Sequence, residues 1–116
     1  MKTLMLSSLL ILMSSTYVLA DGGINPLRLT DDQGAPLYTF DKDTDGVSNC
    51  TGQCAVIWPP VAAPAGALDY DLSVVVRVDG TRQLARQKQP LYTFIQDNKG
   101  SLGTGDNVNG FHIARP

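Results

Sequence analysis

The sequence predicts a small all-β domain of two pseudo-repeats, each made of a hairpin, an ordered loop and a closing strand. Three observations predict this fold class. The pentapeptide Pro-Leu-Tyr-Thr-Phe occurs at 36–40 and again at 90–94. Glycine is abundant and all eleven acidic residues are aspartate, two residue types that favour turns over helices. A run of β-branched residues in the second half is typical of a strand.

The first twenty residues are expected to be a secretory signal peptide that is cleaved off. Lys2 supplies the positive charge, an apolar segment runs from Leu4 to Met13, and Val18-Leu19-Ala20 fits the cleavage site. The apolar segment is shorter than the roughly 18 residues that span a bilayer. No cysteine directly follows it to carry a lipid. We therefore expect a soluble domain at 21–116, without a membrane anchor, outside the cytoplasm.

The charge balance of the expected domain argues against nucleic acid as a partner. Without Lys2, the chain carries eight basic and eleven acidic residues and contains no basic run. A weakly acidic chain of this kind lacks the electrostatic attraction for phosphate backbones or anionic lipid. The expected partner is therefore an envelope protein or a small ligand.

The two pentapeptides mark a duplication, with repeat one at about 27–60 and repeat two at about 82–116. Before each pentapeptide, a short apolar segment and a polar turn predict a hairpin. After each, an aspartate and a glycine introduce a polar loop, and each repeat closes on an aromatic residue, Trp58 or Phe111.

The alternation of side chains along a strand places both aromatic residues of each pentapeptide on one face. We expect these aromatic pairs in a core between the two repeats. A buried tyrosine hydroxyl needs a hydrogen-bond partner, and the aspartate three residues after each pentapeptide is the candidate, unless it caps its own loop. The side chains assigned to this structural set are Tyr38, Phe40, Asp43, Tyr92, Phe94 and Asp97.

The segment joining the repeats predicts an extended connector followed by a meander. Residues 59–66 are rich in proline and alanine and are expected to be stiff and non-helical. The β-branched run at 72–78 is expected to be buried on both faces, and Asp79-Gly80 predicts a tight turn after it. The strands expected in the second half are 72–78, 82–86, 91–94 and one near 111–114.

These motifs resemble a bacterial family of secreted proteins and lipoproteins with repeated Y-x-[FWY]-x-x-D motifs. The motif occurs here at 38–43 and 92–97, and the C-x-x-x-C-x-x-x-W-P-P segment at 50–60 and Gly-Phe-His at 110–112 also resemble the family. The resemblance implies a bacterial envelope protein, periplasmic or secreted, of unknown function. The chain departs from the family in lacking the lipid-bearing cysteine and in carrying Phe111 where tryptophan is common.

The two cysteines predict either a disulfide or a metal site. An even cysteine count in an oxidising compartment favours a Cys50–Cys54 disulfide, which contributes about 2 kcal/mol for so short a ring. The alternative is a copper-binding or thiol-redox site that uses both thiolates and His112, a set that resembles the ligands of envelope copper chaperones. Two thiolates and an imidazole suit copper.

The aspartates after the first pentapeptide match half of a calcium loop. Asp41, Asp43 and Asp45 followed by Gly46 give D-x-D-x-D-G, whose alternate oxygen ligands suit Ca²⁺. The closing acid is missing because Gly52 holds the twelfth position, and repeat two keeps one of the three acids. This pattern predicts at most a weak calcium site.

Catalysis has little support in the sequence. The single histidine has no serine in a nucleophile-elbow context, and no phosphate-binding loop is present. We expect no enzyme activity and no cofactor. The function predicted is an exported, non-catalytic binding or interaction module, with the copper or thiol-redox protein and the weak calcium-binding domain as alternatives.

Overall fold

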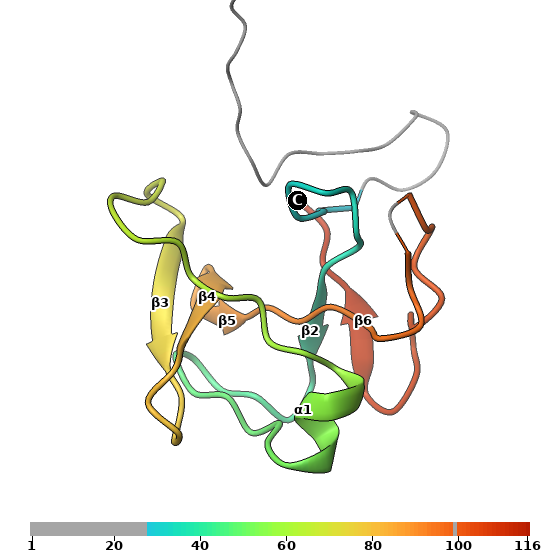
Figure 1. The fold of residues 1–116 in the computed structure, drawn as a ribbon, viewed down its shortest axis with the longest axis horizontal. Coiled ribbons are helices and arrows are strands. Elements are labelled where there is room, and N and C mark those ends of the chain that lie inside the picture. The colour runs from blue at the N-terminus through green and yellow to red at the C-terminus, as the bar shows by residue number, and fades with distance from the viewer. Residues whose placement is uncertain (1–27, 99) are drawn as a thin grey trace, which may run out of the picture.

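The computed structural model describes residues 28–98 and 100–116 (Figure 1). The signal peptide expected at 1–20 and the start of the domain at Asp21 lie outside these described residues. Within them, no helix has the length and apolar character needed to cross a membrane.

In the described residues the fold consists of short antiparallel strands and one short helix, which confirms the all-β class with little helix (Figure 1). One sheet pairs β2 with β6, and the other has the order β3-β4-β5. The elements are β2 (Tyr38–Phe40), α1 (Gln53–Ile57), β3 (Leu72–Val76), β4 (Arg82–Arg86), β5 (Gln89–Pro90) and β6 (Phe111–Ile113).

Both hairpins expected before the pentapeptides are present. In repeat one, Thr30 and Pro36 form an antiparallel bridge, and the Asp31 carboxylate accepts two backbone N–H groups of the turn at 2.9 Å each. In repeat two, β4 pairs with β5 across a turn in which Gln87 and Lys88 have φ of 51° and 69°. Aspartate bonds to its own turn, and such left-handed residues match the twist of a tight hairpin.

The two repeats join at their central tyrosines. The Tyr38 N–H donates to the Tyr92 carbonyl at 2.8 Å, and the Tyr92 N–H donates back at 2.9 Å. Each repeat also supplies a closing segment to the other. Strand β6 of repeat two pairs with β2 of repeat one, whereas Pro60, after Trp58 of repeat one, bridges to Tyr92. The two repeats therefore exchange their closing segments, and neither is a separate unit stacked beside the other.

The alternation of side chains separates the buried residues into two clusters. The face of each pentapeptide that carries the tyrosine belongs to an aromatic cluster, and the face that carries the leucine belongs to an aliphatic one. The buried aromatic cluster contains Tyr38, Cys50, Trp58, Tyr92, Phe94 and Phe111. The buried aliphatic cluster contains Leu29, Leu37, Leu84, Leu91 and Ala114.

The expectation that 72–78 is buried on both faces is wrong. The strand β3 ends at Val76, and along it Val75 is buried with 4% exposure. Val76 and Val78 are 68% and 89% exposed. The reason is that the sheet is covered on one face there: Val75 and Arg77 are buried, whereas Val76 between them points to the open face, as is common in antiparallel sheets.

The expected strand at 91–94 is also wrong, since β5 ends at Pro90. Tyr92 instead forms isolated bridges to Tyr38 and to Pro60, so the backbone leaves the meander to join the repeats. The connector after Trp58 is extended, as expected, and Ala62 bridges to Gln83 of β4. The helix α1 was not expected; it begins inside the loop closed by Cys50 and Cys54 and continues past it to Ile57.

Candidate functional site

The motif tyrosines and aspartates pair across the two repeats. The Tyr38 hydroxyl of repeat one donates to Asp97 of repeat two at 2.5 Å. The Tyr92 hydroxyl of repeat two donates to Asp43 of repeat one at 2.7 Å. Each Y-x-F-x-x-D motif therefore contributes a donor to the other repeat and accepts one from it. Hydrogen bonds to an ionised carboxylate are stronger than neutral ones.

The second oxygen of each motif carboxylate holds the loop that follows it. Asp43 Oδ1 accepts the Asn49 N–H at 2.6 Å. Asp97 Oδ1 accepts the Thr104 N–H at 3.0 Å and the Thr104 hydroxyl at 2.8 Å. The two roles considered for these aspartates, tyrosine partner and loop cap, are thus filled together by one carboxylate in each repeat.

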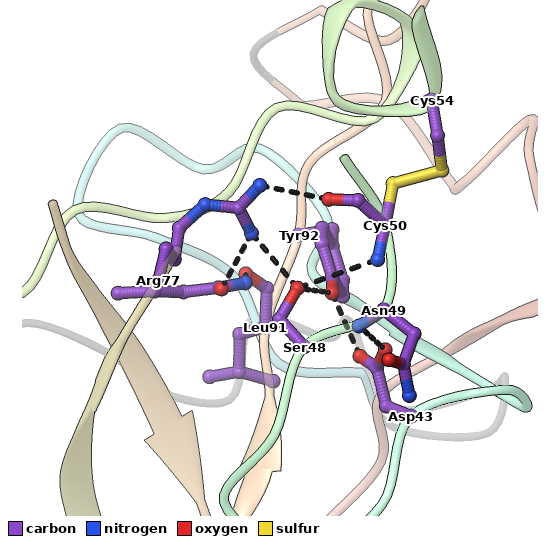
Figure 2. Close-up of a disulfide and its surroundings, with 9 residues drawn as sticks. Asp43, Ser48, Asn49, Cys50, Cys54, Arg77, Leu91 and Tyr92 are labelled. Carbon is purple, nitrogen blue, oxygen red and sulfur yellow. Dashed lines mark hydrogen bonds between the residues drawn. A yellow bond between two sulfur atoms is a disulfide. The ribbon is translucent and has the colours of Figure 1, made fainter. Parts of the chain in front are cut away.

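A buried arginine extends the Asp43 pair into a longer network (Figure 2). Arg77 is 8% exposed, and its guanidinium donates to Ser48 Oγ at 2.8 Å, to Gln83 Oε1 at 2.9 Å and to the Cys50 carbonyl at 2.7 Å. Arginine has no acceptor atom, so Ser48 Oγ accepts this bond. The network therefore ties the cysteine loop to the sheet of β3 and β4.

The two hydroxyl groups of the network both donate in the direction of the Asp43 carboxylate, away from the Arg77 guanidinium. Ser48 Oγ and the Tyr92 hydroxyl lie 2.6 Å apart. Because Tyr92 donates to Asp43, its oxygen is left to accept the Ser48 proton. The chain runs from Arg77 through Ser48 and Tyr92 to Asp43, so each of these four side chains has a hydrogen-bond partner. A fully satisfied chain of this kind fixes one arrangement of a core.

In repeat two, a backbone N–H takes the place of the Ser48 hydroxyl as the donor to the motif tyrosine. The Gly105 N–H donates to the Tyr38 hydroxyl oxygen at 3.0 Å. A Cβ at this glycine would lie 2.5 Å from the Trp58 ring and 2.9 Å from the Phe94 ring. Glycine is required here because any side chain collides with two rings of the core. Gly105, Ser48 and Arg77 were not identified as part of this site from the sequence alone. For Arg77 a signal was present, because a charged residue stands inside a run of valines.

Burial sets the protonation of these groups. Burial raises the pKa of Tyr92 to about 12, and the negative Asp43 beside it adds to the shift while Ser48 opposes it. The pKa of Tyr38 is raised in the same way, by burial first and then by its bond to Asp97. Burial also raises the pKa of Asp43, offset in part by the bonds from Asn49 and Tyr92. Both tyrosines are therefore held as neutral donors.

Four aromatic rings stack through the centre of the domain. The ring centroids of Phe40 and Phe111 are 4.2 Å apart, those of Phe111 and Trp58 3.9 Å, and those of Trp58 and Phe94 4.2 Å. The two motif tyrosines meet this stack edge-on. The outer rings are the motif phenylalanines, and the inner rings are the closing aromatics of the two repeats. Offset stacking and edge contacts both stabilise aromatic packing beyond the area buried.

The candidate copper ligands are not brought together. Cys50 and Cys54 form a disulfide with an S–S distance of 2.02 Å. His112 Nε2 lies 2.9 Å from Asp41 Oδ2, and its Nδ1 lies 2.8 Å from Asn107 Oδ1. Within 28–98 and 100–116, no three His, Cys, Asp or Glu side chains cluster as metal ligands do. Copper binding by the reduced chain stays a prediction.

The aspartates of the candidate calcium loop also point to separate partners. Asp43 is engaged at both oxygens by Asn49 and Tyr92. Asp41 bonds to His112, and Asp45 is exposed. In the described part of the chain these three carboxylates form no ligand cluster. Calcium binding likewise stays a prediction, and it requires these hydrogen bonds to rearrange.

Comparison with known families assigns this double-motif architecture. The sequence pattern of Lipoprotein_15, described as a secreted repeat of unknown function, matches residues 27–62 and 73–115. The chain belongs to the Lipoprotein_15 family. The two matched stretches contain the two motifs, which confirms the resemblance noted in the sequence. No curated protein and no solved structure matches the chain. The fold described above therefore shows how two Lipoprotein_15 repeats complete one domain.

The cross-repeat hydrogen bonds predict an energetic coupling between residues far apart in the sequence. Tyr38→Phe should lower the free energy of unfolding by about 1–3 kcal/mol, because the half-buried Asp97 carboxylate loses its donor. Urea unfolding of Tyr38→Phe, Asp97→Asn and the double variant should give a coupling energy of about 1 kcal/mol or more.

The matched control is the aspartate of the same motif. Tyr38→Phe and Asp43→Asn share no hydrogen bond, so their effects should add within about 0.5 kcal/mol. A coupling energy for the Tyr38–Asp43 pair as large as that for Tyr38–Asp97 would contradict the cross-repeat arrangement.

The raised tyrosine pKa values predict a loss of stability in alkali. Below pH 10, Tyr92 is protonated in both the folded and the unfolded chain, so the contribution of its shift is present in full. As the pH rises from 10 towards about 12, the unfolded chain ionises first. The free energy of unfolding should then fall by about 2 kcal/mol for this residue. Urea unfolding between pH 9 and 11.5 measures the slope, and Tyr92→Phe should flatten it. Equal slopes for the two proteins would show that Tyr92 is not held neutral.

Proposed function

We propose that the chain is an exported, non-catalytic binding module of the bacterial cell envelope, which binds an envelope protein or a small ligand through its exposed surface. The family description as a secreted repeat supports the exported part of this proposal. The binding part depends on how the domain uses its reactive side chains.

One observation carries the proposal: the side chains suited to chemistry are engaged in holding the domain together. The motif tyrosines bond to the motif aspartates, and the cysteines bond to each other. A general acid or base needs to reach a substrate within hydrogen-bond distance. Tyr38 and Tyr92 have no exposed surface, so they act as internal donors that fix the fold.

The surface in turn carries large apolar side chains without an internal role. Tyr70 is fully exposed, and Val76, Val78 and Leu102 are exposed by 68%, 89% and 69%. Exposed apolar groups that gather on one part of a small domain mark contact sites for other molecules. Tyr70 and the two valines belong to the segment that contains β3, and this supports a binding surface there.

Photocrosslinking in the producing cell tests the proposal. A benzophenone amino acid replaces Tyr70 in the full chain, and a matched variant carries it at Asp45, which is exposed on another loop. Tyr70 should give a reproducible adduct, protein or small molecule, that the variant at position 45 lacks. The absence of an adduct at position 70, or the same adducts at both positions, would contradict a binding surface around Tyr70.

A further inference from the structure

The strand β3 has an outer edge that no described residue pairs with. It is the end strand in the order β3-β4-β5 and lies at the outside of the molecule (Figure 1). The residues on either side of it bond to the β4 segment, since the Arg77 N–H donates to the Thr81 carbonyl and the Gln87 N–H donates to the Asp71 carbonyl. The backbone hydrogen bonds from β3 to β4, which point inward, therefore fall at the odd-numbered positions of the β3 segment.

This alternation directs the even-numbered backbone groups outward. Hydrogen-bonded and non-hydrogen-bonded pairs alternate along an antiparallel ladder, so the N–H and C=O groups of Val74 and Val76 point away from β4. Their register partners are Leu84 and Arg82. The outer edge thus presents two consecutive sets of free donors and acceptors, which is the template that an added strand requires.

The side chains at these positions form an apolar strip. Val74 is half-buried and Val76 is exposed on the same face of the strand, and Val78 is exposed in the turn that follows. Natural edge strands are blunted by exposed charges, prolines or bulges. Between Leu72 and Val76 the sequence contains no charge and no proline, and the arginine that follows is turned inward and buried. This edge lacks the usual protection.

We propose that β3 pairs antiparallel with β3 of a second copy of the chain, which joins the two β3-β4-β5 sheets into one. This inference rests on the proposed binding function and names its partner. A two-fold interface must be complementary to itself. A strip of valines at every second position meets that condition, because pairing centred on Val75 sets Val74 opposite Val76 of the second copy.

The area available predicts a weak and reversible dimer. Tyr70, Val76 and Val78 expose on the order of 400 Å² of apolar surface per chain. Two chains therefore bury at most on the order of 800 Å² through these side chains, which lies in the range of transient contacts below about 1,200 Å². The strip carries no charge that would attract an oppositely charged partner, and this favours a second copy of the chain.

Sedimentation velocity of the full exported chain over about 10 µM to 1 mM tests the proposal, with dissociation constants in that range expected for a contact of this size. The mass should rise from monomer to dimer with concentration. Val76→Lys should weaken dimerisation at least tenfold. Val56→Lys, which makes the same change at a 55% exposed valine of α1, should leave it unchanged.

A proline variant separates strand pairing from mere apolar contact. Val76→Pro removes an outward N–H and leaves the β3–β4 bonds in place, since proline is tolerated on edge strands. It should abolish the dimer and leave the melting temperature within a few degrees. Amide hydrogen exchange supplies a second readout: protection at Val74 and Val76 should rise with concentration, whereas Val75, bonded inward, should be protected at every concentration.

Three results would overturn the inference. One is a chain that stays monomeric up to about 1 mM. Another is a dimer that survives Val76→Pro or is lost in Val56→Lys. The third is a monomeric chain whose Val74 and Val76 amides become protected after envelope extract is added. That third result would assign the edge to another protein and would leave the proposed binding function intact.

Discussion

The pairing of Tyr38 with Tyr92 is the interaction on which the rest of the domain depends. Their backbones exchange two hydrogen bonds, and their hydroxyls cross to the aspartate of the opposite repeat. This pairing brings the closing segments into place, so Trp58 and Phe111 stack against each other at the centre. Neither repeat has a complete core without the other. The Y-x-F-x-x-D motif therefore serves to join the two repeats.

The repetition in the sequence predicted much of this arrangement, because five identical residues and the period of a strand suffice to place Tyr38 and Phe40 on one buried face. The hydroxyl partners were also predicted by residue type, since a buried tyrosine needs an acceptor. The sequence could not predict that each tyrosine bonds to the aspartate of the other repeat, because a tyrosine–aspartate bond within one repeat satisfies the same chemistry. The burial of β3 was mispredicted because a continuous valine run does not show whether one face or both faces of its strand are covered.

The two repeats differ where their surroundings differ, and the differences are local. Ser48 and Arg77 serve the Tyr92 hydroxyl, whereas a backbone N–H at Gly105 serves Tyr38. The disulfide lies beside the first arrangement, and the Cys50 carbonyl is held by Arg77. Because the inner polar groups are engaged in this way, the proposed binding would use the exposed side chains, of which Tyr70, Val76 and Val78 lie in or beside β3.

Separation of the two repeats shows whether each one needs the other to fold. The chain can be cut between Gly66 and Ala67, in the exposed connector, and the halves separated in denaturant and then remixed. We expect each half alone to be unfolded and mixing to restore the buried environment of Trp58, the single tryptophan, as seen in its fluorescence. A half that folds by itself, with its own tyrosine bonded to its own aspartate, would show that the repeats do not depend on each other.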